Sequence, residues 1–189
     1  MDTRERIVAE ARRLFAERGY SGATTAEIAR RAGIAEGTIY RHFKSKDDLF
    51  VACVEALFGR AGKQEATDLR AGASLKDVVR ALLRSRVQLV SENLDVFDIL
   101  FSEAPHRPHL LRSAFERAVR VEGEEVAPAL KKFADSGQLR RVSDITEFVL
   151  GITAAIWAVL RFRTWLGQGG GISLEELTDF ILYGIAGNP

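Results

Sequence analysis

The chain has 189 residues, of which 47% are hydrophobic and 28% charged, the composition of an ordinary globular protein. Its one cysteine, Cys53, excludes an internal disulfide and with it a small secreted scaffold held together by disulfides. The charged N-terminus has no apolar segment behind it, and the longest apolar run, 148–160, is too short to span a membrane. We therefore expect a cytoplasmic protein that does not enter a membrane.

The formal net charge of +1 is unevenly distributed along the chain. Residues 1–46 contain ten basic and six acidic side chains, a net charge of +4, so the rest of the chain carries −3. A basic end on an otherwise acidic chain favours an anionic partner, such as nucleic acid or a membrane surface. The same charge also fits a helix face that is simply solvated.

The hydrophobic pattern is helical almost throughout, with no convincing strand or internal repeat. At the N-terminus it predicts three short helices, of which the first two are marked by a capping residue and a terminating glycine. The first is capped by Asp2 and ends at Gly19, and the second begins after Thr24 and ends at Gly33. The third spans 36–43.

A longer helix that starts after Ser45 connects these three to the rest of the chain, where five more helices are expected. Their approximate spans are 74–92, 94–104, 108–136, 143–166 and 173–186. Pro128 should kink the helix over 108–136. The last two helices are apolar on nearly every side, so they must be covered all round. We expect the same pair from a second chain to cover them in a homodimer, with these residues at the interface: Ile152, Ile156, Val159, Leu177, Phe180 and Ile181.

Two short helices joined by a glycine-containing turn, 25–32 and 36–43, have the layout of a helix-turn-helix DNA-binding motif. The second helix is apolar only at Ile39 and Phe43. It turns four polar side chains outward: Thr38, Tyr40, Arg41 and His42. Gly37 has no side chain, so the backbone there is able to approach a phosphate or a base edge closely. The alternative is that the basic residues of this segment form only a solvated surface.

One ordered set of residues runs through 5–55: Ala11, Leu14–Phe15, Gly19–Tyr20, Thr24–Thr25, Ile28–Ala29, Ala32–Gly33–Ile34, Gly37–Thr38–Ile39–Tyr40, His42–Phe43, Ser45–Lys46 and Leu49. This set resembles the N-terminal signature of TetR/AcrR-type transcriptional regulators. The resemblance implies an all-α dimer with a three-helix DNA-binding domain, residues 1–46. It also implies a C-terminal helical bundle for ligand binding and dimerisation, residues 47–189.

The resemblance further implies which residues contact operator DNA: Thr25, Glu36, Gly37, Thr38, Tyr40, Arg41, His42 and Lys46. Among them, Tyr40 and Lys46 are expected to hold phosphates, and Arg41 and His42 to contact base edges. The two recognition helices of a dimer enter successive major grooves about 34–36 Å apart, so the operator should be an inverted repeat of double-stranded DNA.

Two residues depart from the family pattern. Ala35 stands where a serine or similar cap often opens the recognition helix, so the helix lacks a cap worth about 1 kcal/mol. Glu36 places a negative charge on the surface expected to face DNA. It should repel phosphate unless it accepts a hydrogen bond from a cytosine amino group or pairs with Arg41.

A small-molecule effector is expected to bind in the C-terminal domain and to release a repressor from its operator, which is the family default; activation is the alternative. A mostly aromatic set of residues would line the pocket: Phe97, Phe101, Arg112, Phe115, Val119, Trp157 and Arg161. Such a wall favours an apolar or aromatic effector. Aromatic residues at helical spacing more often form a core, so the alternative is that this set belongs to the core.

No cofactor, metal ion or catalytic residue is expected. His106 and His109 alone make a poor metal site, and the prolines around them indicate a turn. Cys53 lies on an apolar stripe, which favours a buried core residue over a redox sensor. An enzyme would need a phosphate-binding loop, a catalytic triad or metal-ligand spacing, and the sequence has none of them. A non-specific DNA-compacting protein would need more basic residues.

Overall fold

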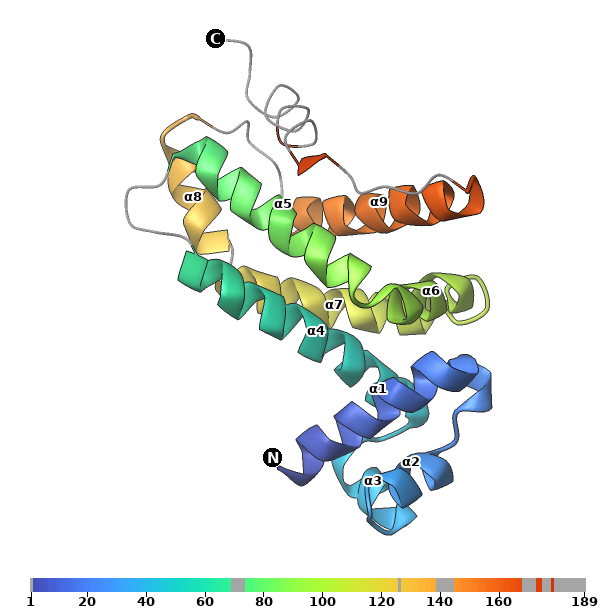
Figure 1. The fold of residues 1–189 in the computed structure, drawn as a ribbon. Coiled ribbons are helices and arrows are strands. Elements are labelled where there is room, and N and C mark those ends of the chain that lie inside the picture. The colour runs from blue at the N-terminus through green and yellow to red at the C-terminus, as the bar shows by residue number, and fades with distance from the viewer. Residues whose placement is uncertain are drawn as a thin grey trace. The chain divides into compact units, whose positions relative to one another are not determined.

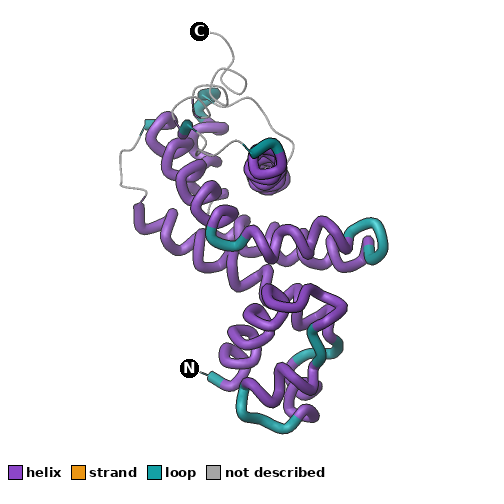
Figure 2. Tube along the Cα trace, turned by 45° about the vertical axis from the view of Figure 1, so that its right-hand side comes forward, coloured by secondary structure: helices purple, strands orange, loops and turns teal. Residues whose placement is uncertain are grey.

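The computed structural model describes residues 2–68, 74–125, 127–138 and 145–167, together with 173, 174 and 178. Every regular element in these residues is an α-helix, which confirms the all-α fold class (Figure 2). The helices shown in Figure 1 are α1 (Thr3–Gly22), α2 (Thr25–Arg31), α3 (Glu36–His42), α4 (Lys46–Asp68), α5 (Leu75–Ser91), α6 (Leu94–Glu103), α7 (Pro108–Glu125), α8 (Ala127–Asp135) and α9 (Ile145–Trp165).

The chain divides into two compact units. The first consists of Met1–Leu57 and Leu94–Arg117, and the second of Phe58–Asn93 and Ala118–Pro189. In the first unit α1 packs against α2 and α6, and α2 packs against α3. In the second unit α5 packs against α8 and α9. The domain boundary expected after residue 46 falls at the start of α4, inside the first unit.

Local signals in the sequence explain why α1 forms where it does. The Asp2 side chain accepts a hydrogen bond from the backbone of Arg4, and Glu5 accepts one from the Asp2 backbone at 3.0 Å, so the expected cap is confirmed. Gly19 has a φ of +68°, which glycine adopts without steric cost, and it interrupts the helical backbone before a last turn ends at Gly22.

Three aromatic rings form the centre of the first unit. Phe15 and Tyr20 on α1 stack with ring centroids 5.8 Å apart, and Phe50 on α4 meets both rings edge to face. All three side chains are buried. Ile28 on α2 and Ile39 on α3 are fully buried as well, so both short helices are fixed to this core through an apolar side chain.

The single helix expected over 108–136 is instead two helices, α7 and α8. Pro128 is the second residue of α8. Proline lacks a backbone N–H, and the first turn of a helix is the place where no intrahelical acceptor is needed. The expectation of one helix kinked at Pro128 is therefore wrong, because the proline lies in the opening turn of a new helix.

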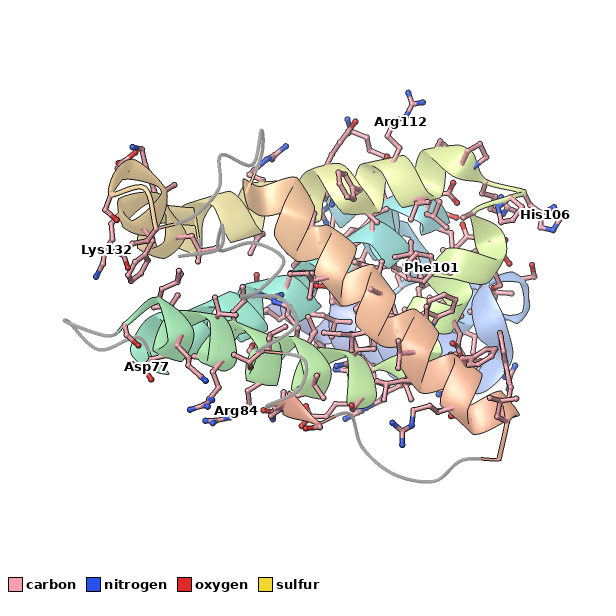
Figure 3. All side chains as sticks on the ribbon, turned by 90° about the horizontal axis from the view of Figure 1, so that it is seen from above. Asp77, Arg84, Phe101, His106, Arg112 and Lys132 are labelled. Carbon is pink, nitrogen blue, oxygen red and sulfur yellow. The ribbon has the colours of Figure 1, made fainter. Side chains whose placement is uncertain are left out.

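In the second unit, α5 is amphipathic. It buries one apolar face together with the Arg86 side chain, whose guanidinium carbon lies 5.8 Å from the centre of the Phe58 ring. Asp77 and Arg84 are exposed and project outward from α5 in Figure 3. No helix in the described ranges combines the length and apolarity that a membrane crossing requires.

The residues expected at the dimer interface differ in how far they are exposed. On α9, Ile156 is buried with 2% of its surface exposed, Ile152 is half-buried, and Val159 is 45% exposed. Of the helix expected over 173–186 the structure describes only residues 173, 174 and 178, and Leu177, Phe180 and Ile181 lie outside the described residues.

Candidate nucleic-acid interface

The turn between α2 and α3 is built by residues that the sequence already marks. The Thr24 side chain caps α2 by accepting a hydrogen bond from the Glu27 backbone at 3.2 Å. Gly33 has a φ of +65°, which lets the chain reverse after α2. Ala35 precedes α3 and makes no side-chain capping bond, so the missing cap expected from the sequence is confirmed. The helix-turn-helix layout is therefore present.

The outer surface of α3 carries most of the expected DNA contacts. Tyr40 is 53% exposed, and Arg41 and His42 are exposed beside it. Glu36 and Gly37 are exposed in the first turn, and a Cβ atom added at Gly37 would meet no other atom within 4 Å. The face of α3 opposite the buried Ile39 side chain is thus open to a ligand. Thr38, the remaining candidate on this helix, is half-buried.

Hydrogen bonds join three of these residues across the two helices. The hydroxyl of Thr25, the first residue of α2, donates to Glu36 with an Oγ1–Oε1 distance of 2.5 Å. The same hydroxyl oxygen lies 3.1 Å from the Tyr40 hydroxyl. Thr25, Glu36 and Tyr40 therefore form one polar cluster, and the carboxylate of Glu36 has a partner that the sequence did not indicate.

Lys46 differs from the other expected DNA contacts because its ammonium turns toward the end of α1. Its Nζ donates to the backbone carbonyls of Tyr20 at 2.9 Å and Ala23 at 3.2 Å, and it lies 4.3 Å from the centre of the Tyr20 ring. Burial lowers the pKa of Lys46, and the neighbouring positive charge of Arg107 acts in the same direction. In the structure Lys46 ties the start of α4 to the end of α1, and its role at a phosphate stays a prediction.

Arg4, at the start of α1, is a basic residue beside α3 that the sequence did not single out. Its guanidinium carbon lies 5.3 Å from the centre of the ring of Phe43, the C-cap residue that follows α3. Arg4 is exposed and so adds positive charge next to the surface of α3. The two residues are far apart in the chain, and no periodicity links them.

A second set of polar contacts joins α1, α4 and α7 within the first unit. Asp47 accepts a hydrogen bond from the Tyr20 hydroxyl and lies 2.5 Å from Nε2 of His109. Burial alone would raise the pKa of Asp47, but the bonds from Tyr20 and His109 outweigh it and hold the pKa below its ordinary value. Arg117, about two helical turns after His109 on α7, bonds to Asp48, the residue that follows Asp47.

The structure also shows where the two histidines lie. The chain turns at 104–106, His106 lies in that turn, and α7 starts at Pro108, so the expected turn is confirmed (Figure 3). His109 faces a carboxylate instead of a second histidine. Cys53 is buried as expected, and burial raises the pKa of its thiol to about 12.

The residues proposed from the sequence as a ligand pocket fall in both units. Phe97, Phe101, Arg112 and Phe115 belong to the first, and Val119, Trp157 and Arg161 to the second. Phe97 is buried and Phe101 is half-buried, whereas Phe115 is 40% exposed and Arg112 points away from α7 into solvent (Figure 3). Trp157 and Arg161 are half-buried, one turn apart on α9. The pocket stays a prediction.

We expect acid to weaken the ion pairs that Glu27 and Glu17 form with the arginines of α2. Hydrogen bonds from Arg30, and then from Arg31, lower the pKa of Glu27 to about 2, and Arg31 also forms two bonds to Glu17. A carboxyl with a lowered pKa in the folded state stabilises the fold above its ordinary value of 4.5, and this contribution is lost as the pH falls toward 2. Urea unfolding followed by circular dichroism should therefore show a smaller loss of stability between pH 4.5 and 2 for Glu27→Gln than for the wild type. If the two proteins lose the same stability over this pH range, the ion pairs of Glu27 do not stabilise the fold.

The fold and the open face of α3 have the layout of a helix-turn-helix DNA-binding motif. Residues 7–53 match the sequence model of the bacterial regulatory proteins, tetR family. Over these residues the chain is similar to the TetR family of transcriptional regulators.

Similar proteins are described as transcriptional regulators or repressors. The uncharacterized HTH-type transcriptional regulator YerO of Bacillus subtilis is 28% identical over 186 residues, which cover 96% of this chain and 62% of YerO, less than two thirds of its length. The HTH-type transcriptional repressor AcnR of Corynebacterium glutamicum is 29% identical over 143 residues, 74% of this chain and 70% of AcnR. A solved structure from Vibrio parahaemolyticus, described as a transcriptional regulator of the TetR family, has the same fold, with a TM-score of 0.72, 22% identity and coverage of 99% and 100%. These relatives are regulators, not enzymes.

Proposed function

We propose that this regulator is a cytoplasmic homodimeric repressor that binds an inverted-repeat operator and is released from it by a small apolar or aromatic molecule. The observation that carries the proposal is the open outer face of α3, where Tyr40, Arg41 and His42 stand exposed on a helix fixed from behind by Ile39. A rigidly held helix with polar side chains outward is what reading of base edges in the major groove requires.

We assign DNA binding to residues 1–46, with base contacts from Arg41 and His42 and phosphate contacts from Thr25, Thr38, Tyr40 and Lys46. Arg41 suits a base edge because its guanidinium forms two parallel hydrogen bonds with guanine. The hydroxyls of Thr25 and Tyr40 lie 3.1 Å apart, close enough for both to bond one phosphate group.

We assign dimerisation and effector binding to residues 47–189. An apolar stripe on α9 supports a dimer: Val159 is 45% exposed, Phe162 59% and Trp165 74%. The exposed residues one and two turns before them, Ala155 and Gly151, are small and leave room for close approach of another helix. Large exposed apolar side chains on one helix face mark an interaction surface.

The first unit offers a route by which an effector could act on the DNA-binding helices. The start of α4 is tied to α1 through Lys46 and through the bond between Asp47 and Tyr20. A shift of α4 at this end would therefore move α1, against which α2 packs. Release of repression by an effector would need a preference of several kcal/mol for the state that does not bind DNA.

Selection of duplexes from a random pool tests the proposal, with Arg41→Ala and Tyr40→Ala as variants. We expect the wild type to enrich an inverted repeat. Arg41→Ala should lose base preference at one position of each half-site and weaken binding by about 1–3 kcal/mol, because it removes a base contact. Tyr40→Ala should weaken binding to all duplexes about equally, because a phosphate contact carries no sequence information. An unchanged site and affinity for Arg41→Ala would disprove its role at a base.

A further inference from the structure

Glu36 is an acidic side chain on the face of α3 that we propose to contact DNA. It is exposed, it is the first residue of the helix, and it belongs to the polar cluster with Thr25 and Tyr40. A carboxylate at this place is repelled by the phosphates of every DNA sequence alike. A protein that binds DNA through this face therefore carries a fixed electrostatic penalty, unless Glu36 finds a hydrogen-bond donor on the DNA.

The structure shows which side chain holds the carboxylate of Glu36. The Thr25 hydroxyl has one proton, and it donates that proton to Oε1 of Glu36 at 2.5 Å. The same proton is the one that Thr25 would donate to a phosphate. The carboxylate and a DNA phosphate therefore compete for Thr25, and the phosphate contact forms only when Glu36 leaves.

The base that Glu36 faces determines whether its carboxylate gains a hydrogen bond when it leaves Thr25. In the major groove a carboxylate is able to accept from an exocyclic amino group, which cytosine and adenine carry. Adenine presents the acceptor N7 beside its amino group, and guanine and thymine present acceptors that repel a carboxylate. Among the four bases, cytosine thus fits Glu36 best.

The geometry points to Glu36 as a specificity-determining residue that requires a cytosine in each half-site, an inference that rests on the proposed DNA-binding function. At a site with this cytosine, the carboxylate moves from Thr25 to the amino group and Thr25 becomes available to a phosphate. At other sites the carboxylate faces phosphates and acceptors without a donor from DNA. Glu36 therefore discriminates mainly by weakening binding to wrong sequences.

Two substitutions of Glu36 test the inference, Glu36→Gln and Glu36→Ala, with Glu116→Gln as the matched control. Glu116 is an exposed glutamate on α7 in the same unit, so its replacement removes the same charge away from α3. Affinity is measured for the duplex that the wild type selects and for a scrambled duplex of equal composition, at one salt concentration. Circular dichroism of each variant confirms that the fold is retained.

We expect Glu36→Ala to bind the scrambled duplex more tightly than the wild type and to lower the ratio of specific to non-specific affinity about tenfold, the effect of one base contact. Repeated selection with this variant should lose one cytosine per half-site. Glu36→Gln should replace that cytosine by adenine, because glutamine pairs with the amino group and N7 of adenine. Glu116→Gln should keep the wild-type motif and ratio.

Retention of every cytosine by both Glu36 variants, with an affinity ratio equal to that of Glu116→Gln, would overturn the inference and leave the proposed function intact. Failure of the wild type to enrich any motif would overturn the proposed function and the inference with it.

Discussion

Replacing Phe50 with alanine is expected to destabilise the N-terminal helices by about 3–5 kcal/mol, the usual cost of removing a buried phenylalanine from a core. Phe50 has no exposed surface, and its ring meets Phe15 at 5.1 Å and Tyr20 at 5.7 Å between ring centroids. Alanine would leave a cavity between α1 and α4 that these rings cannot fill. A domain of this kind has a total stability of only about 5–15 kcal/mol, so DNA binding should be lost together with the fold.

Urea unfolding followed by circular dichroism measures this loss, with Phe115→Ala as the control. Phe115 is the same residue type in the same unit, but 40% of its surface is exposed. Its replacement removes less buried surface and leaves an indentation that water fills, so we expect a markedly smaller loss of stability. Equal losses for the two variants would show that the aromatic cluster is not the core of the unit.

The sequence predicted the elements of the DNA-binding segment well because its signals are local. The cap at Asp2 and the reversal at Gly33 each depend on residues within one helical turn, and both are confirmed. The outward direction of Tyr40 and Arg41 followed from the helical period once Ile39 was placed inside. The prediction of one helix kinked at Pro128 failed because proline is compatible both with a kinked helix and with the start of a new one.

The contacts within the candidate site could not be predicted from the sequence, because they are not local. The bond between Thr25 and Glu36 joins two helices across a turn, and the ammonium of Lys46 reaches backbone carbonyls at the end of α1. Each depends on how helices pack and on which rotamer the packing selects. A periodic pattern specifies the face on which a side chain lies, but not the partner that it meets there.

The same limit applies to α9, where a helix that is apolar on all sides does not reveal which side its own chain covers. The structure buries Ile156 and leaves Phe162 exposed. A charge placed at Ile156, one of the residues expected at the dimer interface, would therefore disrupt the chain's own core and would not report on the interface alone. Phe162 is the better position.

Replacing Phe162 with aspartate is expected to separate the proposed dimer and to weaken operator binding by a factor on the order of 10²–10⁴. The charge falls in the middle of the apolar stripe of α9, between Val159 and Trp165, where association would bury it without a partner. A monomer engages one half-site at a time and loses the high effective concentration that linked recognition helices provide. Light scattering should give the mass of one chain, near 20.9 kDa, and a binding titration on the selected duplex should give the loss of affinity.

Thr164→Asp is the matched control for this experiment. Thr164 is exposed on the same helix, but the helical period places it on the side away from Phe162, so the same charge there should leave both mass and affinity unchanged. Circular dichroism should show folded protein for both variants, because Phe162 is 59% exposed and contributes little to the core of its own chain. A Phe162→Asp protein that still has twice the mass of one chain would move the interface to another face. A monomer that keeps full affinity for the inverted repeat would instead show that one recognition helix suffices, and that the dimer is not what reads the operator.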